Sequence, residues 1–145
     1  MKGRILIVDD SDDNIAMLEE FLAEDEVVIR GVTDSKRAEQ AFAEFSPDMV
    51  LLDLHMPDPD GLEILRRLRG VRASLVFVPV IVLTGDTGNV ARNSALLLGA
   101  DDFLTKPLDR YEVVLRVRNL LRTRQLCLEL ARTNEDLEQE LNRVK

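Results

Sequence analysis

The chain has 145 residues, 46% of them hydrophobic, which is enough to bury the core of one domain of ordinary size. Its net charge of −8 is concentrated in residues 1–109, where 21 acids face 11 bases, so contact with nucleic acid is not expected. No run approaches the roughly 18 apolar residues of a membrane span and no signal peptide begins the chain, which indicates a cytoplasmic protein, and the single Cys127 excludes an intrachain disulfide.

Short runs of β-branched and other apolar residues alternate along the chain with stretches whose apolar residues recur at helical spacing. The first, third and fourth runs are almost continuously apolar, so we expect strands covered on both faces, as in a parallel sheet flanked by helices. The pattern predicts an α/β fold, a doubly wound (βα)5 domain with a five-stranded parallel sheet. The predicted strands are 4–8, 27–32, 49–53, 78–84 and 102–105, and the predicted helices between them are 12–24, 35–45, 60–69 and 87–98.

Residues able to cap a helix stand near the start of three predicted helices. Asp13, Ser35 and Asp109 each offer a side-chain oxygen to the first turn of a helix. After Asp109 no glycine or proline occurs up to Lys145. We therefore expect the fifth helix to be extended well beyond the sheet.

Polar side chains stand at or just after the ends of four predicted strands. Because the carboxyl ends of parallel strands share one edge of the sheet, where ligands bind in open α/β folds, we expect these side chains to converge. Each of them alone is an ordinary turn former or surface residue. An amine opposite three acids is not explained by turn formation, so the group predicts a functional site. Its members are Asp9, Asp10, Asp53, Thr84 and Lys106.

The three acids of this group indicate a bound cation. Three carboxylates a few ångströms apart repel one another unless a hard cation with oxygen ligands neutralises them, and Mg²⁺ is the expected ion, with Mn²⁺ able to substitute. Neither G-x-x-x-x-G-K-[ST] nor G-x-G-x-x-G occurs, so a bound nucleotide is not expected. A carboxylate beside a metal and a lysine can attack phosphorus and form an aspartyl phosphate.

Four sequence blocks, ILIVDD, DLHMPDPDG, VIVLTG and GADDFLTKP, resemble the signature blocks of the receiver domain of two-component response regulators, in matching order over about residues 3–122. The resemblance implies the flavodoxin-like strand order 2-1-3-4-5. It divides the chain into a receiver domain, 1–122, and a helical coiled-coil linker or dimerisation stalk, 123–145. It also implies a phosphorylated switch rather than an enzyme with turnover.

The resemblance implies a role for each residue of the site. Asp53 would accept the phosphoryl group from a sensor histidine kinase or a histidine phosphotransfer protein. Asp10 and Asp53 would bind Mg²⁺ directly, together with the backbone carbonyl of His55, and Asp9 would act through water. Thr84 and Lys106 would hold the phosphoryl oxygens.

The resemblance also implies how the switch works. Phe103 occupies the position of the switch aromatic in the family, and Lys106–Pro107 matches a peptide bond that is cis there. Phosphorylation is then expected to alter the face formed by the fourth helix, the fifth strand and the fifth helix. His55 and Asp86 occupy two variable positions beside the acceptor, where a side chain can tune the access of water to the phosphoryl group.

The tail carries a heptad pattern. Apolar residues recur at alternating spacings of three and four, and a single asparagine at an a position with leucine at d favours a parallel, in-register pair. We expect a parallel homodimer, with a monomeric, solvent-exposed helix as the alternative. An output domain is expected beyond Lys145 or in a separate protein. The predicted seam has Leu120, Cys127, Asn134 and Leu141 at a, and Leu130 and Leu137 at d.

Two other functions remain open from the sequence. A Mg²⁺-dependent phosphatase of the haloacid-dehalogenase type also uses an aspartate nucleophile, a threonine and a lysine. That family needs a second acid two residues after the nucleophile, where this chain has His55. A receiver-like interaction module that signals without phosphate would be expected to lack part of the site, and no site residue is missing here.

Overall fold

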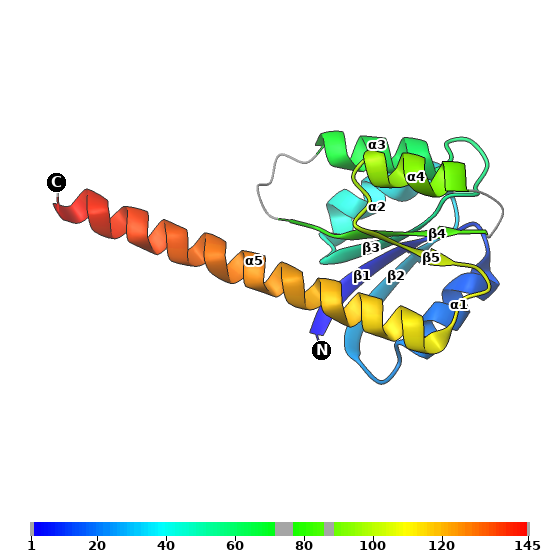
Figure 1. Ribbon diagram of the computed structural model, residues 1–145, viewed down its shortest axis with the longest axis horizontal. Helices are drawn as coiled ribbons and strands as arrows, with labels where there is room; N and C mark the ends of the chain where they lie inside the picture. The colour runs from blue at the N-terminus through cyan, green and yellow to red at the C-terminus, as the bar shows by residue number, and fades with distance from the viewer. Residues whose placement is uncertain (1, 72–76, 86–88, 145) are drawn as a thin grey trace.

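The computed structural model describes residues 2–71, 77–85 and 89–144, in which strands and helices alternate (Figure 1). In chain order the elements are β1 (Lys2–Val8), α1 (Asp12–Phe21), β2 (Glu26–Val32), a short 3-10 helix (Ser35–Arg37), α2 (Ala38–Phe45), β3 (Met49–Asp53), α3 (Gly61–Val71), β4 (Val80–Thr84), α4 (Asn89–Leu97), β5 (Asp102–Thr105) and α5 (Arg110–Val144).

The strands form one five-stranded parallel sheet in the order β2-β1-β3-β4-β5. This confirms the predicted doubly wound fold and its strand order. Helices α2, α3 and α4 cover one face of the sheet, and α1 and α5 cover the other (Figure 1). No helix in the described ranges is both long enough and apolar enough to cross a membrane.

The central strands are buried on both faces because their residues alternate between two cores. In β1, Ile5 and Ile7 belong to the core under α1 and α5, whereas Leu6 and Val8 belong to the core under α2, α3 and α4. All five residues of β3, and all five of β4, are buried. This is the physical reason for the continuous apolar runs in the sequence, and it leaves the ends of these strands rigidly placed.

Two of the three predicted helix caps are wrong. Ser11, not Asp13, caps α1, since the Ser11 side chain accepts the Asn14 backbone N–H and Asp13 lies inside the first turn. Asp34 caps the 3-10 helix that precedes α2, and Ser35 is instead buried, with its hydroxyl donating to the Pro57 carbonyl at 3.1 Å. The cap of α5 is confirmed, because the Asp109 carboxylate accepts the Glu112 N–H at 3.0 Å.

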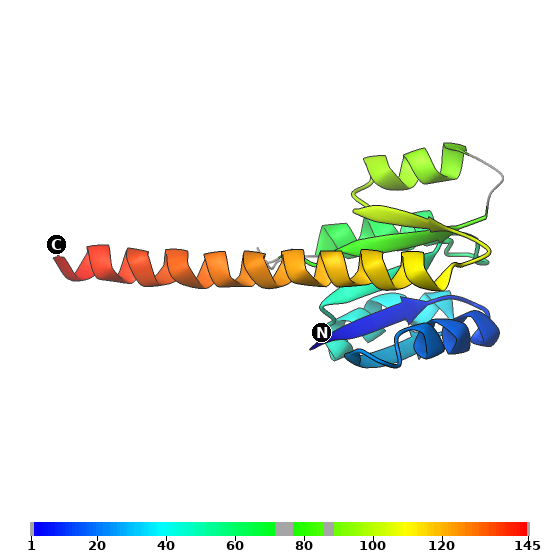
Figure 2. The ribbon, with the colours of Figure 1, turned by 60° about the horizontal axis from the view of Figure 1, so that its bottom comes forward.

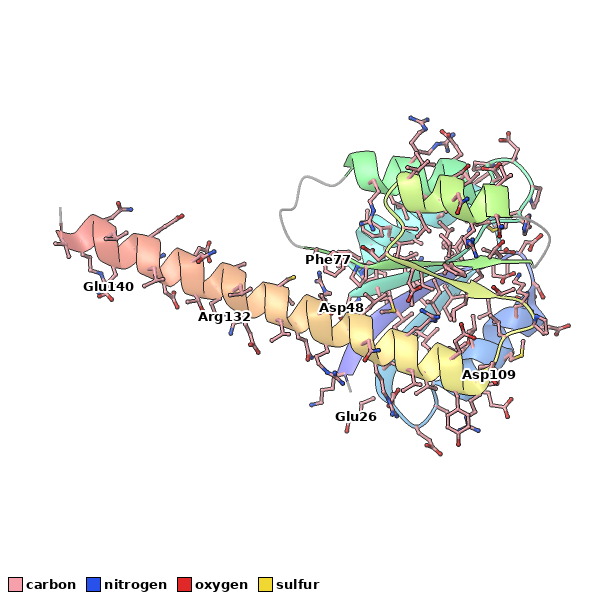
Figure 3. All side chains as sticks on the ribbon, in the orientation of Figure 1. Glu26, Asp48, Phe77, Asp109, Arg132 and Glu140 are labelled. Carbon is pink, nitrogen blue, oxygen red and sulfur yellow. The ribbon has the colours of Figure 1, made fainter. Side chains whose placement is uncertain are left out.

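Helix α5 packs under the sheet over its first half and then leaves the body of the molecule (Figure 2). Val113, Val117 and Leu121 are buried against the sheet. Among the described residues, Arg124 makes the last hydrogen bonds from α5 to the body, donating to the Asp48 carboxylate at 2.9 Å and to the Phe77 carbonyl at 2.6 Å. Asp48 and Phe77 lie where the helix departs (Figure 3), and every residue from 129 to 144 is exposed.

Gly61 opens α3 against the end of β3, and this contact leaves no room for a side chain. A Cβ at Gly61 would lie 2.5 Å from Leu54 Cα and closer still to the Asp53 carbonyl oxygen, both of them backbone atoms that cannot turn aside. Gly70, near the end of the same helix, has nothing within 4 Å of its Cβ position.

We predict opposite effects of alanine at these two glycines. Gly61→Ala should lower the free energy of unfolding by about 3 kcal/mol or more, because the backbone of the β3–α3 connection must move. Gly70→Ala should raise it by roughly 0.5–1 kcal/mol through helix propensity. Urea denaturation followed by circular dichroism measures both. A Gly61→Ala protein as stable as the wild type would contradict the close approach.

Candidate functional site

The polar residues predicted to converge do meet at the carboxyl edge of the sheet. Asp9 directly follows β1, while Asp53 and Thr84 are the last residues of β3 and β4. These three are almost fully buried, at 0%, 2% and 3% exposure. Asp10 is exposed beside them, and Lys106 follows β5, where its backbone N–H donates to the Thr84 carbonyl at 2.8 Å. The buried strands therefore hold Asp9, Asp53 and Thr84 in fixed positions.

Asp9, Asp10 and Asp53 form an acidic triad in which one carboxylate oxygen from each residue lies within 4.8 Å of the others. The donor set consists of oxygen atoms carrying negative charge, which is the set preferred by hard divalent cations. Two of the carboxylates are buried, so water screens their mutual repulsion only weakly. The triad therefore fits a divalent cation such as Mg²⁺ by both its chemistry and its charge.

Lys106 is shared between two acids of the triad. Its Nζ lies 3.3 Å from Asp53 Oδ1 and 3.5 Å from Asp9 Oδ2. Its side chain is 26% exposed, so the ammonium group approaches the carboxylates from the solvent side. One cation thus offsets part of the repulsion between two buried acids and touches the carboxylate at the end of β3.

Burial raises the pKa of the Asp53 carboxyl above its usual range. The Asp9 carboxylate adds to this effect by repulsion, whereas the His55 backbone N–H, which donates to Asp53 Oδ1 at 3.0 Å, and the Lys106 ammonium oppose it. Since the pKa remains raised, the partners present do not fully offset the cost of holding a charged Asp53 in the folded protein.

Asp9 has a partner that sequence reasoning missed. The Asn14 side-chain amide donates to Asp9 Oδ2 at 3.2 Å and to Asp9 Oδ1 at 3.4 Å, and the Ser11 backbone N–H donates to Asp9 Oδ1 at 2.9 Å. The sequence did contain a signal for this contact. Asn14 is the third residue of the first helix, and at that position a side chain lies one helical turn from the end of the preceding strand. Among the described residues, no buried side-chain nitrogen or oxygen lacks a hydrogen-bond partner.

The residues assigned to the switch lie between β4, α4 and β5. The Thr84 hydroxyl donates to the Gly85 carbonyl at 3.0 Å. Phe103 is half-buried, and the Arg92 guanidinium lies over its ring at 4.9 Å from the centroid, a cation–π contact that the sequence did not suggest. The Lys106–Pro107 peptide bond is cis. His55 is exposed, and Asp86 lies outside the described residues.

Comparison with known proteins gives a consistent result. The family profile of the "Response regulator receiver domain" matches residues 5–118. The chain is 39% identical over 119 residues to the transcriptional regulatory protein TrcR of Mycobacterium tuberculosis. This match covers 82% of the chain and 45% of TrcR. The chain is also 36% identical over 130 residues to the response regulator PleD of Caulobacter vibrioides. This match covers 90% of the chain and 28% of PleD. The chain thus spans less than half the length of these two relatives.

Solved structures of similar shape agree with the sequence relatives. The fold superposes on NtrX of Brucella abortus with a TM-score of 0.82 and 27% identity, over 92% of this chain and 30% of that one. It superposes on the BeF3-activated N-terminal receiver domain of RstA from Klebsiella pneumoniae with a TM-score of 0.74 and 28% identity, over 82% and 98% of the two chains.

We predict that Asp53→Asn stabilises the metal-free protein at neutral pH. The raised pKa of Asp53 means that ionisation of this carboxyl disfavours folding, so the wild type loses stability relative to the variant as the pH rises from about 3.9 through the raised pKa of the folded state. Above that pKa the free energy of unfolding of the variant should exceed that of the wild type by on the order of 1 kcal/mol, which corresponds to a few degrees of melting temperature.

Thermal melts in a chelator, taken at several pH values, measure this difference. Asp48→Asn is the matched control, since the Asp48 carboxylate accepts hydrogen bonds from Arg124 and from the Arg4 backbone, and loss of its charge should lower the melting temperature. An Asp53→Asn protein that melts below the wild type at neutral pH would show that the site does not strain the fold.

Proposed function

The chain belongs to the response regulator receiver family, and from that premise we propose that Asp53 is the aspartate that accepts the phosphoryl group. A receiver domain is a phospho-acceptor of two-component signalling rather than a conventional enzyme, and it implies a histidine kinase as its partner. The observation that carries the assignment is the contact of Lys106 with Asp53, at the end of a fully buried strand and beside two further acids. A phosphotransfer protein could serve as the donor in place of the kinase.

The reaction follows from this arrangement. An oxygen of Asp53 attacks the phosphorus of a phosphohistidine; the new P–O bond forms as the P–N bond breaks, and the imidazole leaves with the electron pair and takes up a proton. Bound Mg²⁺ would neutralise the negative charge of the carboxylates and the phosphoryl group. We propose Asp10, Asp53 and the His55 carbonyl as its ligands and Asp9 as its contact through water. Mn²⁺ has the same preference for oxygen ligands and would substitute.

Lys106 and Thr84 are proposed to hold the transferred group. Lys106 lies within 3.5 Å of both Asp9 and Asp53, so a small movement brings it to a phosphoryl oxygen. The Thr84 hydroxyl would exchange the Gly85 carbonyl for another phosphoryl oxygen. Phe103 would then move against β4, and the face of α4, β5 and α5 would change. His55 and Asp86 are proposed to control the access of water to the phosphoryl group.

The two alternatives drawn from the sequence lose support. A phosphatase of the haloacid-dehalogenase type is a different family from the one that matches this chain. A receiver that signals without phosphate would be expected to lack part of the site, whereas the presence of all five site residues at one edge of the sheet favours phosphorylation.

We predict that acetyl phosphate with Mg²⁺ adds one phosphoryl group to the wild-type protein. Intact-mass spectrometry should show a single addition that disappears in Asp53→Asn and in a chelator. Asp13→Asn is the matched control, since it removes an exposed acid near the site that has no role in the mechanism. Equal labelling of Asp53→Asn and the wild type would assign the nucleophile to another residue.

We further propose that α5 pairs with α5 of a second copy in a parallel homodimer. The exposed part of the helix carries Leu130, Leu137 and Leu141 at 64%, 58% and 63% exposure, with Asn134 among them. A lone helix of this length is only marginally stable in water unless its apolar side packs on a partner. Leu120 packs on the core beneath the sheet, so the intermolecular seam would begin at Cys127 rather than at Leu120.

A dimer test follows from the exposed leucines. The wild type should sediment as a dimer at tens of micromolar, and Leu137→Glu should sediment as a monomer because it places a charge in the seam. Gln139→Ala, on the far side of the helix from Leu137, should leave the dimer intact. Mild oxidation should link two Cys127 thiols of a parallel pair. A wild-type monomer without this crosslink would support the solvent-exposed helix instead.

The signal would leave the receiver along α5. TrcR and PleD are both more than twice as long as the part of them that matches this chain. We propose that α5 leads to an output domain beyond Lys145 or binds a separate protein.

A further inference from the structure

Asn14 joins the first helix to the phosphorylation site through Asp9. It is the third residue of α1, and its backbone N–H donates to the Ser11 side chain that caps the helix. Its side-chain amide turns back and contacts both oxygens of Asp9, at 3.2 and 3.4 Å. The helix cap therefore fixes the backbone of Asn14, and the amide in turn fixes the Asp9 carboxylate.

Asp9 depends on few donors. It is fully buried, and its carboxylate contacts the Ser11 backbone N–H at 2.9 Å, the Asn14 amide, and Lys106 at 3.5 Å. Of these, Lys106 also contacts Asp53. When the ammonium group turns to a phosphoryl group on Asp53, we expect its contact with Asp9, the longer of the two at 3.5 Å, to weaken. Asn14 is then the side-chain donor that remains with Asp9, because its own position is set by the helix.

The third position of a helix is where a glutamate or glutamine commonly reaches back to the N–H of the capping residue. Here the Asp9 carboxylate already accepts that N–H, from Ser11. An acid at position 14 would therefore face a buried carboxylate and repel it. An amide supplies a donor instead, which explains why asparagine suits the place although it is a modest helix former.

We propose that Asn14 is a positioning residue of the phosphorylation site, whose amide holds the Asp9 carboxylate in place for the cation and keeps it partnered when Lys106 leaves. This inference rests on the proposed function, since it assigns Asp9 to the cation and Lys106 to the phosphoryl group. Groups that orient direct metal ligands change metal affinity by roughly 10- to 100-fold when removed, and because Asp9 would contact the cation through water we expect an effect at the lower end of this range.

Melting temperature against Mg²⁺ concentration tests the inference without any turnover. The wild type should gain stability with Mg²⁺, because cation binding to the folded state shifts the unfolding equilibrium. Asn14→Ala should need roughly tenfold more Mg²⁺ for half of that gain. Asn142→Ala, an exposed asparagine on the far part of α5, is the matched control and should follow the wild type. Asp10→Asn should lose most of the gain.

A double substitution tests the sharing of Lys106. In the metal-free protein, Asn14→Ala should lower the melting temperature more in a Lys106→Ala background than in the wild type, because the Asp9 carboxylate would then keep only the Ser11 N–H of the three donors described above. Purely additive losses would overturn the idea that the two side chains support the same carboxylate.

The outcomes separate this inference from the proposed function. If Mg²⁺ does not stabilise the wild type, the cation site itself fails, and the inference fails with it. If Mg²⁺ stabilises the wild type and Asn14→Ala to the same extent at the same concentrations, the site stands and Asn14 has no positioning role. A tenfold shift confined to Asn14→Ala, with the surface control unchanged, supports the assignment.

Discussion

The repulsion among three carboxylates at one edge of the sheet is the constraint on which the rest of the structure depends. Their oxygens lie within 4.8 Å of one another, and two of the acids are buried. Burial, and to a smaller extent repulsion by Asp9, raises the pKa of Asp53, and the His55 backbone N–H and Lys106 offset only part of this effect. A bound positive charge would reduce the repulsion among these acids, so we expect binding of a cation to stabilise the folded protein.

The buried strands hold the three acids together despite the repulsion among them. Asp53 ends a strand whose five residues are all buried, and Gly61 lets the start of α3 pack directly against the backbone at the end of β3. Asp9 is fixed from one side by β1 and from the other by the first turn of α1. The energy for holding the acids together comes from the apolar cores on both faces of the sheet, which extend up to the residues directly before the site in β1, β3 and β4.

Most of the architecture could be read from the sequence because it depends on patterns within single segments. Continuous apolar runs identified the strands, and the ends of those runs located the acids, the threonine and the lysine. What could not be read depends on contacts between segments. The amide of Asn14 reaches back to Asp9, Arg92 lies over Phe103, and Arg124 joins Asp48 to α5, and each of these residues looks like an ordinary surface position in the sequence. The caps of α1 and of the 3-10 helix before α2 were misplaced by two residues and one residue for a related reason, since several neighbouring side chains offered an oxygen and only the backbone geometry selects one.

The path of α5 connects the two ends of the sheet. Asp109 caps the start of the helix beside the carboxyl edge where the acids lie. The last hydrogen bonds to the body, among the described residues, join Arg124 to Asp48 and Phe77, which precede β3 and β4 at the amino edge. Between these points it is held along one side by Val113, Val117 and Leu121 and on another by Arg118, which pairs with Asp25 at 2.8 Å. A helix fixed in this way moves as a rigid rod, so a displacement at its start must either break the Arg124 contacts or carry the exposed end with it. Since a helix of 35 residues is about 50 Å long, even a rotation of a few degrees at the receiver displaces its far end by several ångströms. If a change at the acidic edge reaches the exposed leucines, we therefore expect it to do so by loosening or shifting the contacts of Arg124.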